Sequence, residues 1–145
     1  MDWFDVSSEP HQRTFEHDCR LSSLPSERER ELAALWRLEA DVNNGAYLQF
    51  LCNWGRDSYV YASQALNKIG AARMAAIVDQ CQALVDEHWG DRPLDYVAME
   101  ETLPGRVSQR LLDLSYEFMD YPDDIAGLGM NYYGPHVSGG DTAPG

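Results

Sequence analysis

Apolar side chains recur every three or four residues along most of this chain, and glycine or asparagine interrupts the pattern at short intervals. The clearest case covers residues 71–89, where the recurrent positions are Met74, Ile77, Val78, Cys81, Leu84, Val85 and His88. A spacing of i, i+3, i+4 and i+7 places such side chains on one face of an α-helix. No segment of strand length alternates apolar and polar residues, and the pattern therefore predicts an all-α fold.

We expect a compact bundle of about five helices joined by tight Gly/Asn turns, because glycine and asparagine tolerate the left-handed backbone that ends many helices. The first predicted helix begins at residues 25–26 and ends at a turn formed by Asn43-Asn44-Gly45, and the others cover about residues 47–55, 58–69, 71–89 and 106–120. Residues 1–24 contain Pro10 and show no sustained period, apart from a short helix at 14–21, and residues 91–105 are expected to form a connection. The prediction is a single helical domain over residues 1–125 and an irregular, Gly-rich C-terminal tail over residues 126–145.

The charge of the chain is strongly negative, since 24 acidic residues face 11 basic ones and give a net charge of −13. Such a protein repels free nucleic acid and anionic membranes and attracts basic proteins. The three cysteines do not have the spacing of a disulfide framework. We find neither a signal peptide nor an apolar run long enough to cross a bilayer, so we expect a cytoplasmic protein.

Half of the acidic residues lie within one third of the chain. Between Asp79 and Asp124, only three arginines oppose twelve carboxylates, which leaves a local net charge of −9. Excess charge of one sign favours association with a partner of the opposite sign. The predicted partner-binding residues are these twelve: Asp79, Asp86, Glu87, Asp91, Asp95, Glu100, Glu101, Asp113, Glu117, Asp120, Asp123 and Asp124.

The last predicted helix carries the most regular acidic row. Asp113, Glu117 and Asp120 lie opposite its apolar stripe, although like charges at this spacing destabilise a helix by a few tenths of a kcal/mol. Carboxylates four residues apart rise about 6 Å along the helix axis, which is comparable to the separation of successive phosphates on a DNA strand. We therefore consider a face that imitates DNA and binds a basic DNA-binding protein. The competing interpretation is a solvated acidic face in which Arg110 pairs with Asp113.

A recognisable motif follows the first predicted helix. It contains Val42-Asn43-Asn44-Gly45, then Gln49-Phe50, Asn53 and Gly55, and it leads to Ala-Leu-Asn-Lys-Ile-Gly-Ala at residues 65–71. These motifs resemble the bacterial domain-of-unknown-function family that includes the nineteen-kilodalton DNA-mimic protein, over about residues 27–120. Two positions depart from the family pattern, because Ala46 replaces a usual second glycine and Trp54 replaces a small residue. The motif is expected to be structural and to form a hinge between two helices through Glu39, Asn43, Asn44, Gly45, Asn53 and Gly55.

The resemblance implies a helical domain, for which a homodimer is one expected state. The DNA-mimic member of that family imitates DNA and occupies a helix-turn-helix transcription regulator. Only the acidic surface, as a general property, is carried over to this chain. A rival hypothesis is a protein-interaction or self-association module that uses apolar surface such as Met130-Asn131-Tyr132-Tyr133.

The remaining alternative is an enzyme or metal protein built around Glu39, whose position falls within the apolar face of the first predicted helix. A buried carboxylate can act as an acid or a base, but it can equally accept hydrogen bonds from the backbone, Asn43 or Asn44. Cys81 and His88 are about 10 Å apart along a helix, too far for one zinc ion, and His11, His17 and Cys19 match no standard zinc pattern. Phosphate-binding loops are absent. We therefore expect no cofactor, no metal and no catalytic residue.

Overall fold

The computed structural model describes residues 1–134 and confirms the predicted all-α class. These residues form eight α-helices and no strand. The helices are α1 (Trp3–Arg13), α2 (Glu27–Gly45), α3 (Tyr47–Trp54), α4 (Arg56–Ile69), α5 (Ala72–His88), α6 (Tyr96–Thr102), α7 (Gly105–Met119) and α8 (Ile125–Tyr133). Two short 3-10 helices, η1 (Thr14–His17) and η2 (Leu21–Ser23), connect α1 to α2. The expected number of about five helices was therefore wrong, because α1, α6 and α8 were not predicted.

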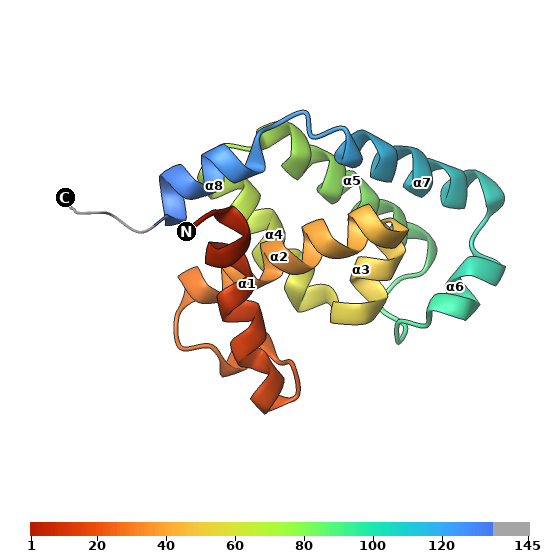
Figure 1. The fold of residues 1–145 in the computed structure, drawn as a ribbon. Coiled ribbons are helices and arrows are strands. Elements are labelled where there is room, and N and C mark those ends of the chain that lie inside the picture. The colour runs from red at the N-terminus through yellow and green to blue at the C-terminus, as the bar shows by residue number, and fades with distance from the viewer. Residues whose placement is uncertain (135–145) are drawn as a thin grey trace.

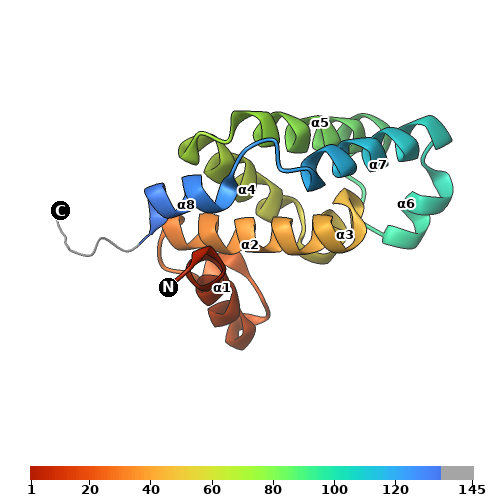
Figure 2. The same ribbon diagram turned by 45° about the horizontal axis from the view of Figure 1, so that its top comes forward.

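Helix α2 crosses the middle of the molecule and organises its packing (Figures 1 and 2). It packs against α1 on one side and against α3 and α4 on the other, while α5 packs against α4 and α7. The side chains of Leu35, Leu38 and Val42 on α2 are almost completely buried. No helix among residues 1–134 has both the length and the apolar composition that crossing a membrane requires.

Helix α1 was missed because its buried face is only partly apolar. The buried positions are Trp3, Val6, Ser7, Ser8, Pro10 and His11, which include three polar side chains and a proline. A proline inside a helix removes one backbone hydrogen bond, so packing against α2 must outweigh this cost. A reciprocal capping box between Asp2 and Asp5 begins the helix, and its three-residue spacing was the available sequence signal.

Helices α6 and α8 correct two further predictions. Residues 96–102 are helical within the predicted connection at 91–105, and residues 126–133 are helical within the predicted irregular tail. Both helices begin at an aspartate that accepts a hydrogen bond from a backbone N–H of the first turn, namely Asp95 and Asp124. Each helix is short, and α6 buries only Met99, which is too little for a periodic pattern to indicate. Residues 135–145 of the predicted tail lie outside the described residues.

The glycines of α8 allow a close approach rather than an irregular chain. A Cβ atom on Gly129 would lie 2.5 Å from the Trp3 ring of α1. The neighbouring Tyr133 is buried, and its hydroxyl donates a hydrogen bond of 2.8 Å to Glu31 of α2. The segment that was expected to offer a free aromatic surface is therefore partly packed onto the body, although Tyr132 remains half exposed.

The predicted glycine turns are confirmed at Gly55, Gly70 and Gly90, all of which have positive φ angles. The prediction that Asn43-Asn44-Gly45 forms the turn after the first helix was wrong by one residue. These three residues continue α2, and the chain turns at Ala46, with φ 75° and ψ −179°. That conformation is essentially restricted to glycine, which gives a physical reason for the glycine that the family usually carries there.

Candidate functional site

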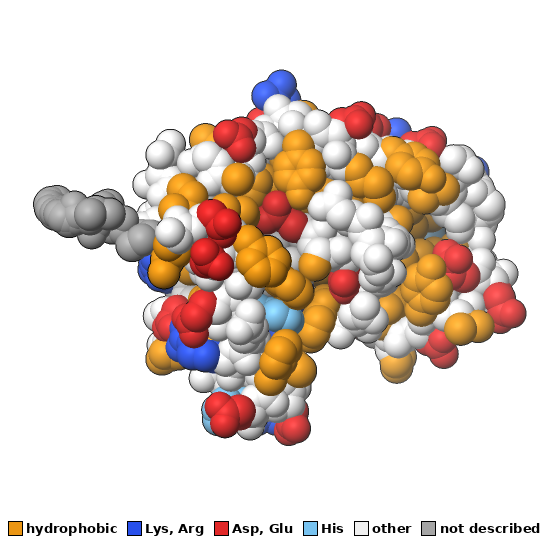
Figure 3. Space-filling model, in the orientation of Figure 1, with side chains coloured by type: hydrophobic (Ala, Val, Ile, Leu, Met, Phe, Trp, Pro, Cys, Tyr) orange, Lys and Arg blue, Asp and Glu red, His pale blue; other side chains and the backbone are white. Residues whose placement is uncertain are grey.

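Six of the twelve predicted carboxylates are exposed and lie on α6, on α7 or directly beside an end of these two helices, which follow one another in the chain. We call this set the α6–α7 acid row; it consists of Asp95, Glu100, Glu101, Asp113, Glu117 and Asp120. Figure 3 shows red acidic side chains gathered at the α6 end of the molecule, with hydrophobic side chains between them. Tyr96 and Val97 contribute exposed hydrophobic surface to the same helix.

The other six predicted carboxylates do not share one environment with this row. On α5, Asp79 is half-buried and accepts hydrogen bonds of 2.8 and 2.7 Å from Tyr59 and Ser63 of α4. The Asp123 carboxylate lies 3.1 Å from the Arg73 guanidinium and accepts a hydrogen bond from the backbone N–H of Met74. Burial alone would raise the pKa of Asp123, but these contacts outweigh it and lower the pKa. The remaining members are the helix cap Asp124 and the exposed side chains of Asp86, Glu87 and Asp91.

The row on α7 is partly opposed by arginine. The Arg110 guanidinium lies 3.7 Å from Glu117, whereas Asp113 accepts a hydrogen bond from Gln109 rather than pairing with Arg110 as the competing interpretation suggested. Glu117 and Asp120 also line a groove of about 430 Å³ between α5 and α7, whose wall includes Arg73. Within residues 1–134, the three carboxylates at the α6 end have no lysine or arginine nitrogen within 4.0 Å, so they are less directly opposed than Glu117.

The motif at the end of α2 has a structural role that centres on Asp41. Its carboxylate accepts hydrogen bonds from Asn53 and Trp54, at 3.1 and 2.7 Å, and thereby joins α2 to α3. Asn43 donates to the backbone oxygen of Glu39 and to the Tyr121 hydroxyl, at 2.7 and 2.9 Å. Sequence reasoning named Asn53 but missed Asp41 as its partner, because two residues twelve positions apart are brought together only by the turn at Ala46.

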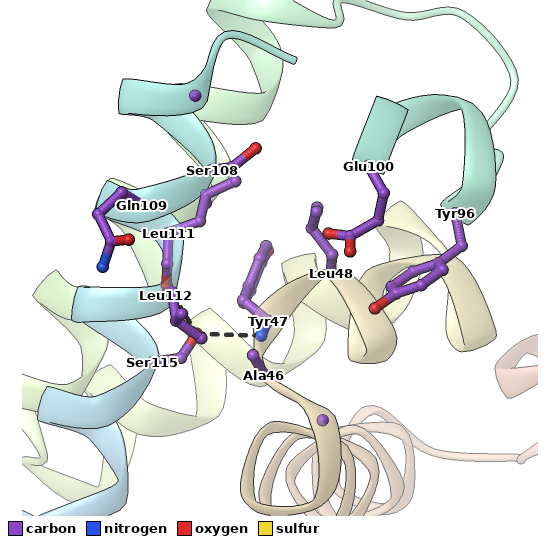
Figure 4. A pocket seen from close by; sticks show the side chains of 12 residues that line it. Ala46, Tyr47, Leu48, Tyr96, Glu100, Ser108, Gln109, Leu111, Leu112 and Ser115 are labelled. Atoms are coloured by element: carbon purple, nitrogen blue, oxygen red, sulfur yellow. Dashed lines mark hydrogen bonds between the residues drawn. The ribbon is translucent and has the colours of Figure 1, made fainter. Parts of the chain in front are cut away.

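A cavity of about 330 Å³ adjoins this turn and is shown in Figure 4. The start of α3 forms one wall, with Tyr96 and Glu100 of α6 on one side and Ser108, Gln109 and Leu112 of α7 on the other. The backbone N–H of Tyr47 donates a 3.0 Å hydrogen bond to Ser115 across the base of the cavity. Its lining offers one carboxylate, from Glu100, and no basic side chain.

Residues 22–135 match the family described as DMP19-like protein, and this stretch includes α2 to α8. The chain belongs to the DMP19-like family. Most of the sequence motif that suggested this assignment lies at the α2–α3 turn. Helix α1 lies outside the matched residues.

A comparison of the chain with curated proteins found no match, and a comparison with solved structures found none either. The family assignment therefore rests on the match to residues 22–135.

Glu39 lies on α2 beside α1, where the structure gives both its oxygens a neutral donor. Trp3 Nε1 donates at 2.7 Å and the Tyr121 hydroxyl donates at 2.8 Å. Burial raises the pKa of the Glu39 carboxyl, and these two hydrogen bonds only partly oppose that effect. The expected donors Asn43 and Asn44 do not reach its carboxylate; Trp3 and Tyr121 come from distant segments that the sequence could not place.

A buried arginine lies two residues away on the same helix. Arg37 is 1% exposed, donates to His11, Ser58, Thr14 and the backbone oxygen of Cys19, and lies 4.3 Å from the Trp54 ring centroid. Burial, and secondarily the Arg37 charge, lower the pKa of His11 to about 4. Within residues 1–134, no three His, Cys, Asp or Glu side chains form a group able to hold a metal ion.

Proposed function

We propose that this protein is an acidic binding protein that imitates DNA and occupies the phosphate-contacting surface of a basic DNA-binding protein, such as a transcription regulator. The single observation that carries this proposal is the α6–α7 acid row, in which six exposed carboxylates come from two consecutive helical segments. Proteins that bind DNA mainly through phosphate contacts recognise closely spaced negative charge. The resemblance to the family of the DNA-mimic protein supports the same conclusion.

The spacing on α7 suits this role. From Asp113 to Glu117 and on to Asp120, the carboxylates rise by about 6 and 4.5 Å along the helix. Their exposure leaves them free to contact a partner. Arg110 beside Glu117 weakens the negative potential locally, so we expect the α6 carboxylates to contribute at least as much as those of α7.

The decisive experiment captures proteins from the host lysate on the immobilised protein and elutes them with duplex DNA. We expect DNA-binding proteins to be retained at low salt, to be released by duplex DNA, and to be lost as the salt concentration rises. A variant with Asp113→Lys, Glu117→Lys and Asp120→Lys should retain none of them.

A control variant with the same change in net charge carries Glu9→Lys, Glu16→Lys and Asp18→Lys, three exposed positions before α2. It should retain the DNA-eluted proteins, because those side chains lie outside the α6–α7 acid row. Equal loss from both variants would reduce the effect to net charge, and proteins that duplex DNA fails to elute would contradict the mimicry.

A further inference from the structure

A second surface lies between α1 and α2, where a pocket of about 220 Å³ is lined by aromatic rings and one carboxylate. We call it the aromatic pocket; it is formed by Trp3, Phe4, Ser7, Trp36, Glu39 and Ala40. Hydrophobic side chains gather over α1 and α2 in Figure 3, with acidic side chains among them. Pockets for drug-sized ligands usually have roughly 300–1,000 Å³, so this one is suited to a single side chain.

The rings of the aromatic pocket are held in place by contacts behind them. Trp36 stacks on the buried His11, with ring centroids 4.2 Å apart and planes inclined by 17°. Trp3 donates its indole N–H to Glu39 and lies 6.5 Å from the Tyr133 ring. Only Phe4 is freely exposed, at 61%, and it meets Trp36 edge-on. The pocket is therefore largely preformed, which reduces the ordering cost of binding.

The carboxylate in this pocket lacks a cation. Glu39 accepts one hydrogen bond at each oxygen, from Trp3 and Tyr121, and each carboxylate oxygen can accept a second. Within residues 1–134, no basic side chain lies within 4.0 Å of it, in contrast to Glu31 on the same helix, which pairs with Lys68. Burial that raises the pKa of Glu39 also strengthens its attraction for a cation.

We propose that the aromatic pocket binds an arginine side chain of a basic partner protein. Aromatic faces attract cations, and a guanidinium can stack on an indole while donating hydrogen bonds to a carboxylate. Charge complementarity favours this occupant, because the pocket adds a half-buried carboxylate without a basic partner to a protein that is already strongly acidic. The aromatic pocket is formed by α1 and α2 and contains no residue of the α6–α7 acid row. Arginine binding there therefore does not depend on the imitation of DNA.

The test is an NMR titration of the full chain with the peptide acetyl-Gly-Arg-Gly-amide. The readout is the set of four tryptophan indole N–H signals. The signal of Trp3 is the one that disappears in the variant Trp3→Phe. We expect the Trp3 and Trp36 signals to shift and saturate with the arginine peptide, and to stay unchanged with a matched peptide in which citrulline replaces arginine. Equal shifts with the neutral peptide, or tighter binding of a lysine peptide, would overturn the assignment.

Two matched variants locate the site. Phe4→Ala should weaken arginine-peptide binding by about fivefold, as expected from the loss of one cation–π contact. Phe15→Ala should leave binding unchanged, since Phe15 is similarly exposed at 57% but contacts His11 outside the pocket. Equal effects of the two substitutions would contradict the proposal.

A charge variant completes the test. Glu39→Gln keeps a hydrogen-bonding side chain and should weaken binding at least about tenfold, because the charge-assisted contact is lost. If Glu39→Gln fails to fold, as judged by circular dichroism, the Phe4 and Phe15 pair still decides the question. The variant Asp113→Asn, Glu117→Gln and Asp120→Asn should bind the peptide normally, so a failure of this proposal is distinct from a failure of the DNA mimicry.

Discussion

Helix α2 carries two carboxylates in similar positions with different surroundings. Glu31 and Glu39 each accept a hydrogen bond of 2.8 Å from a tyrosine hydroxyl of the C-terminal segment, Tyr133 and Tyr121 respectively. Glu31 is 1% exposed and also contacts Lys68 at 2.7 Å and Gln64. Glu39 has only the neutral donors Trp3 and Tyr121 and borders a pocket.

The difference separates a carboxylate that stabilises the fold from one that remains able to bind. Around Glu31, the charge is balanced within the protein and three helices, α2, α4 and α8, are joined. Around Glu39, the charge is held by hydrogen bonds alone, and an external cation can complete the site. The two ends of α2 also differ in local stability. Ser26 caps the start of the helix with a hydrogen bond, whereas the helix ends at Ala46, whose backbone is strained.

The largest effect is expected from removal of the balanced charge. Glu31→Gln should lower the free energy of unfolding by about 2 kcal/mol, because Glu31 is 1% exposed and its charged carboxylate is the partner of Tyr133, Gln64 and Lys68. Urea denaturation followed by circular dichroism measures this. The exposed neighbour Glu27, 3.9 Å from Lys68, provides the control, and Glu27→Gln should cost less than about 0.5 kcal/mol. Similar costs at both positions would remove the distinction between a buried and a surface pair.

Removal of the cation should make the two sites alike. Lys68→Met leaves Glu31 with neutral donors only, as Glu39 is now, and should cost about 1 kcal/mol, since the Lys68 side chain is 35% exposed and partly screened. Lys68→Arg keeps the charge and should preserve most of the stability. Denaturation at low and high salt measures both, and no loss in Lys68→Met would mean that the cation contributes little to the Glu31 site.

The strained end of α2 can be tested by restoring the residue that its backbone favours. Ala46→Gly should raise the free energy of unfolding by about 1 kcal/mol, because relief of the positive-φ strain exceeds the greater flexibility of glycine in the unfolded chain. The control is Ala83→Gly on the exposed face of α5, which should destabilise by about 1 kcal/mol. A melting temperature that falls for Ala46→Gly would show that the turn is not strained.

The smallest effect on stability, and one that depends on pH, is expected from Glu39→Gln. Because burial raises the pKa of Glu39 in the folded protein, the folded state holds this proton more tightly than the unfolded chain. That contribution to stability is complete below the ordinary pKa of 4.5 and is lost as pH rises through the raised pKa.

The cost of Glu39→Gln should therefore be largest near pH 4 and below about 1 kcal/mol at pH 7. Denaturation of both proteins across this range measures the difference. A cost that grows towards neutral pH would indicate that the charged form is stabilised in the fold, as expected for Glu31 rather than Glu39.

Helical periodicity determined the class of fold and located five helices, because α2, α3, α4, α5 and α7 each bury an apolar stripe that local sequence reveals. The family was suggested separately, by the resemblance of the residues around the α2–α3 turn to a known motif. It could not find α1, whose buried face contains Ser7, Pro10 and His11, nor α6 and α8, which are too short for a period to emerge.

The sequence by itself also determined the amount of negative charge and its concentration after Asp79. Only the tertiary structure decided how that charge is used, because burial and neighbours depend on segments far apart in the chain. It opposed Asp123 with Arg73, left the α6–α7 acid row exposed, and surrounded Glu39 with Trp3 and Tyr121 from the two ends of the described chain. A carboxylate's environment is set by three-dimensional packing, and the local sequence around Glu31 and Glu39 contains no sign of the lysine that distinguishes them.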